Sequence, residues 1–309
     1  MSDVPQLLIV AAESAPWTDA VMSLAAPQRR TVVVAPRDEI ETSAVEVVVG
    51  APPDLAAIIP RCPQLRWVQS TWAGIDAIAH FASETLQITP LKGVFGPAMT
   101  EYVMGWLLAI ERNVISRASH TQWAPSLEPR IAGKRLGIMG TGGIGIAIAL
   151  AAKHFRLEVI GLNSDGRAVD GFTACYPSAD RLAFAEGLDY LISVLPQTAQ
   201  TDNLIDHEVL MRLNPGAIVI NAGRGNAVVE ADLIASLNAG HLRTAVLDVF
   251  REEPLPPDDP LWSSPGVHVT SHTAGPTPDE AIAEVFERNL QRYIAGEPLA
   301  DAVAAGRGY

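Results

Sequence analysis

The sequence predicts an α/β fold made of two Rossmann-like, doubly wound parallel-sheet domains with a cleft between them. Short apolar runs alternate with amphipathic stretches along the whole chain, which is typical of parallel strands joined by crossover helices. The runs fall into two sets, four before about residue 70 and six after about residue 134. No long Gly/Ser-rich or charged linker separates the sets. Two domains of similar construction are therefore expected.

The apolar runs are the expected strands. They are continuous rather than alternating, which indicates strands that are buried on both faces. In chain order they are QLLIVA, RTVVVAP, AVEVVVG and LRWVQS in the first set, then KRLGIMG, LEVIGL, YLISVL, AIVINA, TAVLDVF and VHVTS in the second.

Helices are expected over residues 101–117, 144–153, 230–239 and 278–295. The last of these comes after the second set of strands is complete, so we expect it to return to the first domain. Its apolar residues form one core-facing stripe, namely Ile282, Val285, Phe286, Leu290 and Tyr293. The expected domains are residues 1–93 with 276–309, flavodoxin-like, and residues 94–275. A cleft between two domains is a common place for an active site.

Charge and cysteine content disfavour several classes of function. The 309 residues include 35 acidic and 22 basic ones, a net charge of −13, which repels nucleic acid and anionic membranes alike. No apolar stretch reaches the roughly 20 residues of a membrane span, and the N-terminal MSDVPQLLIVAAES is interpreted as a strand rather than a signal peptide. Cys62 and Cys175 form no framework for disulfides or metal, so a cytoplasmic protein without a metal is expected.

A glycine-rich turn follows the strand at 136–139. The residues Gly140, Thr141, Gly142, Gly143, Ile144 and Gly145 match GxGxxG and open a helix. In this motif the first glycine allows a tight turn, the second lets a pyrophosphate approach the backbone, and the third lets helix and strand pack closely. The following helix N-terminus offers amides and a positive dipole. The turn therefore predicts dinucleotide binding, with a merely structural turn as the alternative.

The next strand ends at the position that distinguishes NAD from NADP. A carboxylate there bonds the ribose 2′-hydroxyl of NAD, whereas a nearby arginine suits the 2′-phosphate of NADP. The chain has Asn163, Ser164, Asp165, Gly166 and Arg167. The neutral pair and Arg167 favour NADP(H), while Asp165 keeps NAD(H) open, either as a replacement carboxylate or as a turn residue.

Three polar residues follow later strands. Arg224 lies in NAGRG, Glu253 in LDVFREEPL and His272 in VHVTSHTAG. Because strand ends face the ligand crevice of an open α/β sheet, all three can meet at one site. Each taken singly also fits a surface or loop residue. A metal pair of His268 and His272 is excluded, because residues four apart in a strand lie about 13 Å apart.

These motifs, in this order, resemble the D-isomer-specific 2-hydroxyacid dehydrogenase family. The resemblance covers nearly the whole chain and includes Leu195-Pro196 with Thr201. The stretches at 70–76 and 94–102 and the closing Arg307-Gly-Tyr309 look most like the glyoxylate/hydroxypyruvate reductase A branch. Formate dehydrogenases of the family carry Gln where Glu253 stands, which disfavours that branch.

The resemblance implies roles for individual residues. Arg224 resembles the substrate-binding arginine, Glu253 the carboxylate paired with the histidine, and His272 the proton donor, while backbone amides of Trp72, Ala73 and Gly74 hold the substrate carboxylate. The first domain is then the substrate domain and the second the dinucleotide-binding domain. The expected cofactor contacts are Gly140, Thr141, Gly142, Gly143, Ile144, Gly145, Asn163, Ser164, Arg167, Leu195, Pro196, Thr201, Ala222, Gly223, Asp248 and His272.

The implied reaction is the reduction of small 2-keto acids, with glyoxylate and hydroxypyruvate as the first candidates. The chemistry is consistent with it: a guanidinium forms a fixed donor fork for a carboxylate, and a histidine titrates near neutral pH. Two alternatives remain within the family: the substrate is another 2-keto acid or phosphite, or the reductant is NADH. A dinucleotide-sensing protein without catalysis is the non-enzymatic alternative. The resemblance also implies a homodimer. The apolar residues 102–110 are a candidate part of its interface, and the alternative is that they are buried in the core of the monomer.

Overall fold

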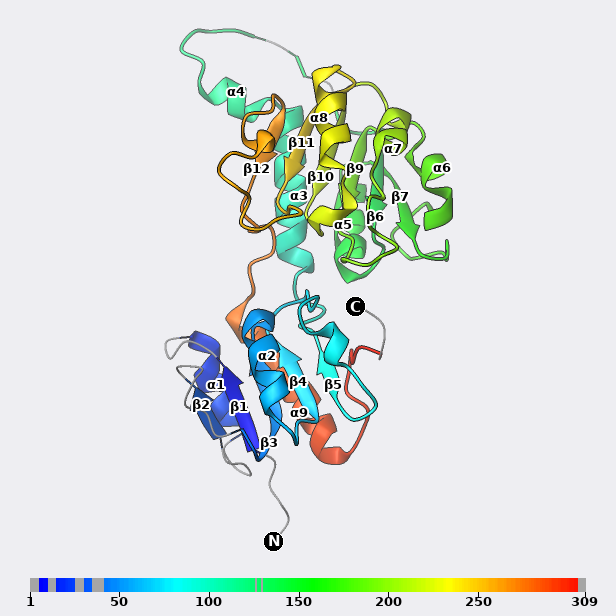
Figure 1. The fold of residues 1–309 in the computed structure, drawn as a ribbon. Helices are drawn as coiled ribbons and strands as arrows, with labels where there is room; N and C mark the ends of the chain where they lie inside the picture. Colours follow the sequence, from blue (N-terminus) through cyan, green and yellow to red (C-terminus); the bar gives the residue numbers. More distant parts are fainter. Residues whose placement is uncertain are drawn as a thin grey trace. The chain divides into compact units, whose positions relative to one another are not determined.

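The computed structural model describes residues 6–10, 15–25, 31–34, 42–125, 127–128 and 130–304. The chain divides into two compact units, Met1–Val94 with Thr277–Tyr309, and Phe95–Pro276 (Figure 1). The closing triplet Arg307-Gly-Tyr309, which contributed to the resemblance, lies outside the described residues.

In its described part, the first unit contains a five-stranded parallel sheet of order β2-β1-β3-β4-β5, the order of flavodoxin-like folds. The strands are β1 Gln6–Val10, β2 Thr31–Val34, β3 Val45–Gly50, β4 Trp67–Ser70 and β5 Gln87–Thr89. The helices are α1 Pro16–Ala25, α2 Pro52–Ile58 and α9 Asp279–Ala295, with the short 3-10 turns η1 Ile59–Arg61 and η2 Ala79–Phe81. β5 was not expected, since its three residues form no apolar run.

Helix α9 packs within this first unit. Its residues Ile282, Val285, Phe286 and Leu290 are buried, and the fifth predicted member, Tyr293, is partly buried with its ring centroid 5.5 Å from that of Trp67, which confirms that the stripe faces the core. Phe286 stacks on the fully buried Trp67 of β4, with ring centroids 5.3 Å apart. Aromatic side chains bury large apolar areas, so this pair fixes the C-terminal helix on the sheet.

The second unit contains, in its described residues, a seven-stranded parallel sheet of order β12-β11-β10-β9-β6-β7-β8. The strands are β6 Arg135–Met139, β7 Glu158–Asn163, β8 Ala174–Pro177, β9 Tyr190–Ser193, β10 Ala217–Asn221, β11 Leu242–Leu247 and β12 Val267–Val269. The helices are α3 Gly96–Glu111, α4 Val114–Ala118, α5 Gly143–His154, α6 Arg181–Ala185, α7 His207–Arg212 and α8 Glu230–Asn238, with the 3-10 turns η3 Ser178–Asp180, η4 Gly225–Ala227 and η5 Pro260–Trp262. The strand order reverses at β6, which has β9 on one side and β7 on the other (Figure 1).

Both faces of this second sheet are covered. Successive residues of β10 point to opposite sides, so Val219 joins one apolar cluster while Ile218 and Ile220 join another. All five residues of β10 are buried. The continuous apolar run AIVIN is explained by this position between two helix layers, and the predicted doubly wound fold is confirmed.

One predicted helix is wrong in its extent. Residues 101–117 form not one helix but two, because the chain turns at Asn113, whose φ of 49° is left-handed. Asparagine tolerates that conformation better than most residues, and it separates α3 from α4. Helix α3 also starts earlier than expected, at Gly96, with Pro97 in its first turn. No helix among the described residues is long and apolar enough to cross a membrane.

Candidate active site

The glycine-rich turn joins β6 to α5 at the point where the strand order reverses. Gly140 has a φ of 104°, a conformation that favours glycine, and a Cβ added at Gly145 would lie 1.9 Å from the Gly140 carbonyl oxygen. By contrast, a Cβ added at Gly142 or Gly143 would meet no atom within 4 Å. The first and last glycines are therefore needed by the turn itself, while the middle ones leave their side of the backbone open to a ligand.

Helix α5 begins at this open surface. Gly142 is its N-cap and supplies no side-chain hydrogen bond to the first turn. The first backbone amides of a helix have no partner within the helix, and together with the helix dipole they favour an anion. The residues present therefore fit the pyrophosphate of a dinucleotide. Thr141 is buried beside them and accepts a hydrogen bond from Asn163 Nδ2 at 3.1 Å.

Asn163 ends β7, but its amide is used by the turn that follows. Its Nδ2 also donates to the Arg167 carbonyl oxygen at 2.9 Å, and its Oδ1 accepts from Gly166 N at 2.6 Å. The side chain is 8% exposed. Asn163 thus shapes the turn that presents Ser164, Asp165 and Arg167.

Two charged side chains of that turn form an exposed ion pair. Arg167 Nη1 lies 3.0 Å from Asp165 Oδ1, and both side chains are mostly exposed. The pKa of Asp165 is lowered, first by a hydrogen bond from the Arg167 backbone amide and further by the Arg167 charge. The Arg167 guanidinium is therefore presented at the surface of the turn after β7, paired with the Asp165 carboxylate.

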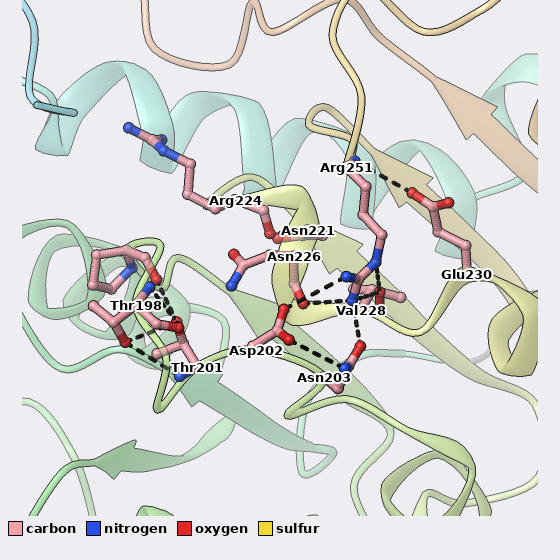
Figure 2. Close-up of polar contacts among 11 residues, drawn as sticks. Thr198, Thr201, Asp202, Asn203, Asn221, Arg224, Asn226, Val228, Glu230 and Arg251 are labelled. Atoms are coloured by element: carbon pink, nitrogen blue, oxygen red, sulfur yellow. Dashed lines mark hydrogen bonds and ion pairs between the residues drawn. The ribbon is translucent and has the colours of Figure 1, made fainter. Parts of the chain in front are cut away.

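The loop after β9 is ordered by two threonines. Thr201 Oγ1 donates to the Pro196 carbonyl oxygen at 2.7 Å and accepts from Thr198 N at 3.0 Å, while Thr201 N donates to Thr198 Oγ1 at 3.2 Å (Figure 2). Leu195 is buried at the start of this loop. The predicted cofactor residues Leu195, Pro196 and Thr201 therefore belong to one closed turn.

The loop after β10 packs backbone against backbone on its neighbours. A Cβ added at Gly223 would lie 2.5 Å from Leu195 N, and one added at Gly225 would lie 1.9 Å from the Phe250 carbonyl carbon. Ala222 is also buried, and its amide donates to the Ser193 carbonyl oxygen at 3.0 Å. The glycines of NAGRG are thus required because adjacent strand-end loops touch there.

Arg224 lies between these two glycines. Asn221 Nδ2 donates to its carbonyl oxygen at 3.0 Å, and its own Nη1 donates to the Gly223 carbonyl oxygen at 2.8 Å. In Figure 2 the guanidinium extends away from Asp202 and Arg251.

Glu253 and His272 form a directly bonded pair. His272 Nδ1 lies 2.8 Å from Glu253 Oε2, and the other carboxylate oxygen accepts from Phe250 N at 2.9 Å. Both side chains are partly exposed. The imidazole edge that carries Nε2 is not used by this pair, so the arrangement is that of a histidine held by a carboxylate and able to exchange a proton with a ligand.

Asp248 holds the loop that carries His272. Its carboxylate is 1% exposed and accepts from Thr270 Oγ1 at 2.5 Å, Thr273 N at 2.9 Å and Ala274 N at 2.9 Å. Since Thr270 Oγ1 donates to Asp248, it accepts from the Tyr102 hydroxyl, 2.6 Å away. Burial raises the pKa of Tyr102 to about 12, so this hydroxyl stays protonated.

His272 itself has a φ of 54°, and its backbone amide donates to the Asp248 carbonyl oxygen at 2.8 Å. The geometry therefore gives Asp248, which the sequence marked as a cofactor-site residue, a role in positioning this loop. The backbone amides of Thr273 and Ala274, which donate to its carboxylate, lie 25 and 26 residues from Asp248 in the sequence, and such bonds to main-chain donors leave no side-chain pattern.

The expected carboxylate-binding loop lies in the first unit. Ser70 Oγ accepts from Trp72 N at 3.0 Å, and Leu91 N donates to the Trp72 carbonyl oxygen at 2.9 Å. The Trp72 side chain is 47% exposed. Because the Trp72 amide is bonded to Ser70, the candidate donors for a ligand reduce to Ala73 and Gly74, whose amides form no hydrogen bond with any described residue. Within the described part of the chain, no group of three metal-ligating side chains occurs.

The strand order, the glycine turn and the open amides of α5 define the class of the second unit: an α/β dinucleotide-binding unit. Residues 104–274 match the family described as "D-isomer specific 2-hydroxyacid dehydrogenase, NAD binding domain". The chain belongs to the D-isomer-specific 2-hydroxyacid dehydrogenase family and is therefore an oxidoreductase.

Three relatives illustrate the similarity. The glyoxylate/hydroxypyruvate reductase A of Yersinia enterocolitica is 35% identical over 215 residues, 68% of each chain. A family protein from Aeromonas salmonicida has a solved structure with a TM-score of 0.90 and 32% identity, covering 98% of this chain and 99% of that one. The structure of an NADPH-dependent glyoxylate/hydroxypyruvate reductase from Sinorhizobium meliloti, in complex with NADP and sulfate, gives a TM-score of 0.85 and 28% identity, covering 98% of this chain and 100% of that one.

Proposed function

We propose that this enzyme reduces small 2-keto acids, glyoxylate and hydroxypyruvate first, to 2-hydroxy acids with NADPH as reductant. The observation that carries the proposal is the 2.8 Å pair of His272 and Glu253, built on the same unit as the dinucleotide turn. The relatives named above, two of which are glyoxylate/hydroxypyruvate reductases, support the choice of substrate.

The reduction needs a hydride and a proton. A bound nicotinamide supplies the hydride to the keto carbon, and the carbonyl π electrons move to oxygen. His272, as imidazolium, gives that oxygen its proton and becomes neutral. Glu253 accepts from Nδ1–H, so it fixes the tautomer and stabilises the imidazolium. After product release, His272 takes up a proton from solvent, which its partial exposure permits.

The substrate carboxylate needs cationic and amide donors. Arg224 supplies a guanidinium fork toward the carboxylate and the polarised carbonyl. The Ala73 and Gly74 amides supply further donors from the first unit. Trp72 contributes an exposed aromatic surface in the same loop.

Arg167 supports NADPH as the preferred reductant. It belongs to a turn without a carboxylate at Asn163, and a 2′-phosphate carries more negative charge than the Asp165 carboxylate that pairs with Arg167 now. NADH is then a slower alternative, with Asp165 in contact with the ribose. The Sinorhizobium meliloti relative, solved with NADP, supports this order of preference.

The test follows absorbance at 340 nm with purified protein, glyoxylate or hydroxypyruvate, and NADPH or NADH at equal concentrations. The proposal expects faster oxidation of NADPH. His272→Ala should lower kcat by roughly 10²- to 10⁴-fold while NADPH binding persists. Silence of the wild-type enzyme with every small 2-keto acid, together with tight NADPH binding, would instead favour a dinucleotide sensor.

Cofactor preference is tested separately. Arg167→Ala should weaken NADPH and spare NADH, and Arg212→Ala is a matched control because it removes an arginine from another exposed ion pair. An equal loss for both cofactors would remove Arg167 from 2′-phosphate recognition.

We further expect a cytoplasmic homodimer. Both cysteines are free thiols, which suits a reducing compartment. On α3, the side chains of Tyr102, Trp106 and Leu108 are only partly buried, which leaves apolar surface for a partner copy. Light scattering on the purified protein checks the dimer.

A further inference from the structure

Arg251 is the centre of a polar network that the proposed reaction does not use. Its Nε and Nη2 both donate to the Val228 carbonyl oxygen, at 3.2 and 3.0 Å, and Nη2 also donates to the Asn226 carbonyl oxygen at 2.7 Å. Nη2 further donates to Asn203 Oδ1 in a short hydrogen bond, and Nη1 lies 3.5 Å from Asp202 Oδ1 (Figure 2).

These contacts join three strand-end loops. Arg251 stands two residues before Glu253, in the loop after β11. Asn226 and Val228 belong to the loop after β10, two and four residues beyond Arg224. Asp202 and Asn203 close the loop after β9, directly after Thr201. The guanidinium on the Glu253 loop thus contacts two other strand-end loops that carry expected site residues, those of Arg224 and Thr201.

Two of the three loops are already joined without Arg251. Asn203 N donates to the Asn226 carbonyl oxygen at 2.9 Å, and Ile205 N donates to the Ala227 carbonyl oxygen at 2.8 Å. Gly225 lets its loop pack against the backbone at Phe250. Such packing limits the distance between the two loops but does not fix their relative orientation. Among the contacts described above, the Arg251 guanidinium makes the hydrogen bonds that join the Glu253 loop to the other two loops.

The backbone of Arg251 is restrained as well. Its amide lies 3.5 Å from Glu230 Oε1, at the start of α8. Burial is the main cause that raises the pKa of Glu230, and the Arg251 backbone amide and charge act in the opposite direction. Arg251 is therefore held at both its backbone and its guanidinium.

We propose that Arg251 is a positioning residue for the reduction: its guanidinium sets the loop of Glu253, the partner of His272, relative to the loops of Arg224 and Thr201. The inference rests on the proposed function, because the residues being aligned are those of the 2-keto acid reaction. Small misplacements of reacting groups are costly, about 10²-fold for roughly 1 Å. The effect should therefore fall on kcat more than on cofactor binding.

The experiment compares Arg251→Ala with Arg212→Ala, which removes an exposed arginine paired at 2.9 Å with Glu186, a residue before β9 and so at the other end of that strand from the loop of Asp202 and Asn203. We expect Arg251→Ala to lower kcat for the better of the two 2-keto acids about 10- to 100-fold. The KM for substrate and the Kd for NADPH should stay within about threefold, and Arg212→Ala should match the wild type.

Chemical rescue separates positioning from general stability. The Arg251 side chain is 36% exposed, so free guanidinium can reach the space it leaves. Millimolar guanidinium chloride should restore several-fold of the lost kcat in Arg251→Ala and none in the control. A lower Tm with unchanged kcat per folded molecule would overturn the proposal, and so would equal losses in kcat and NADPH affinity.

A second variant covers the case in which Arg251→Ala does not fold. Asn203 has a φ of 56°, so Asn203→Gly removes the amide acceptor and keeps the backbone conformation accessible. It should lower kcat several-fold without changing the Kd for NADPH, and wild-type kcat in this variant counts against the proposal.

Amide hydrogen exchange gives a readout that needs no turnover. Arg251→Ala or Asn203→Gly should speed exchange at residues 203–205 and 226–229 and leave β10 protected. If the wild-type enzyme turns over no small 2-keto acid, the proposed function fails, and unchanged exchange in the variants then independently refutes Arg251 as the link between the loops.

Discussion

Glu253→Gln tests the proton donor because the structure determines which end of the new amide faces the histidine. In the native protein, Phe250 N donates to Glu253 Oε1, and His272 Nδ1 faces Oε2. Phe250 N–H needs an acceptor, so the glutamine oxygen takes that place and its NH₂ group faces Nδ1. Nδ1 of the neutral histidine then accepts from this NH₂ group, so the proton of the neutral ring lies on Nε2. In the imidazolium, the Nδ1–H group faces the glutamine NH₂ group, donor against donor.

The magnitude follows from the lost contact. A hydrogen bond to a charged group contributes about 1.5–3 kcal/mol, which corresponds to about 10- to 100-fold. Both side chains are partly exposed, so solvent screening places the expected loss in kcat/KM near the lower end of that range at neutral pH.

The reverse reaction sharpens the test. Oxidation of a 2-hydroxy acid should lose the same factor in kcat/KM as reduction, because a substitution in the enzyme cannot change the equilibrium constant of the reaction. The assay is the 340 nm rate in both directions at neutral pH, with Glu252→Gln as a control of equal charge change in the same exposed loop. A wild-type kcat/KM in Glu253→Gln, or an equal loss in Glu252→Gln, would refute the assigned role of Glu253.

Four further substitutions probe how the site and the unit around it are held. Asp248→Asn puts an NH₂ group against the backbone amide of either Thr273 or Ala274, because each amide donates to a different carboxylate oxygen, so it should cost roughly 2–4 kcal/mol in urea unfolding and lower kcat; an unchanged midpoint would contradict the buried anchor. Gly225→Ala should prevent stable folding, since its Cβ would lie 1.9 Å from backbone, whereas Gly142→Ala should fold normally and lose NADPH affinity; equal behaviour of the two would refute the distinction. Asp206 caps α7 through Val209 N and pairs with Arg181 at 2.7 Å, and although burial opposes them these contacts lower its pKa. Asp206→Ala should therefore cost about 1–2 kcal/mol at pH 7, and the difference should shrink below about pH 4 as the native carboxylate is protonated.

The strands that sequence analysis found are those with continuous apolar runs, and the two it missed lack such runs for physical reasons. β5 has three residues, and β8 is an edge strand whose residues Ala174–Pro177 are partly exposed and end in proline. An edge strand is not buried on both faces and needs no apolar run. The left-handed turn at Asn113 likewise has no signal in an amphipathic pattern, because the apolar spacing continues across it.

For the candidate site, glycine spacing predicted more than side-chain identity did. The GxGxxG pattern correctly separates glycines that the backbone requires from those that leave open space. By contrast, the side-chain amide of Asn163 forms hydrogen bonds within the turn that follows β7. Asp248 and Arg251 form hydrogen bonds mainly with main-chain donors and acceptors. Main-chain partners can have any side chain, so such roles leave no mark in a single sequence.

Two different kinds of contact align the strand-end loops of this unit. Gly223 and Gly225 let neighbouring backbones touch, which fixes how close the loops lie but allows them to slide. Arg251 and Asp248 add directional hydrogen bonds to main-chain atoms, which resist sliding. An added methyl at either glycine should therefore disturb folding first, whereas removal of the Arg251 guanidinium should leave the protein folded and slow its chemistry. The loss of kcat without loss of NADPH affinity in Arg251→Ala is then the measurement that distinguishes alignment from packing.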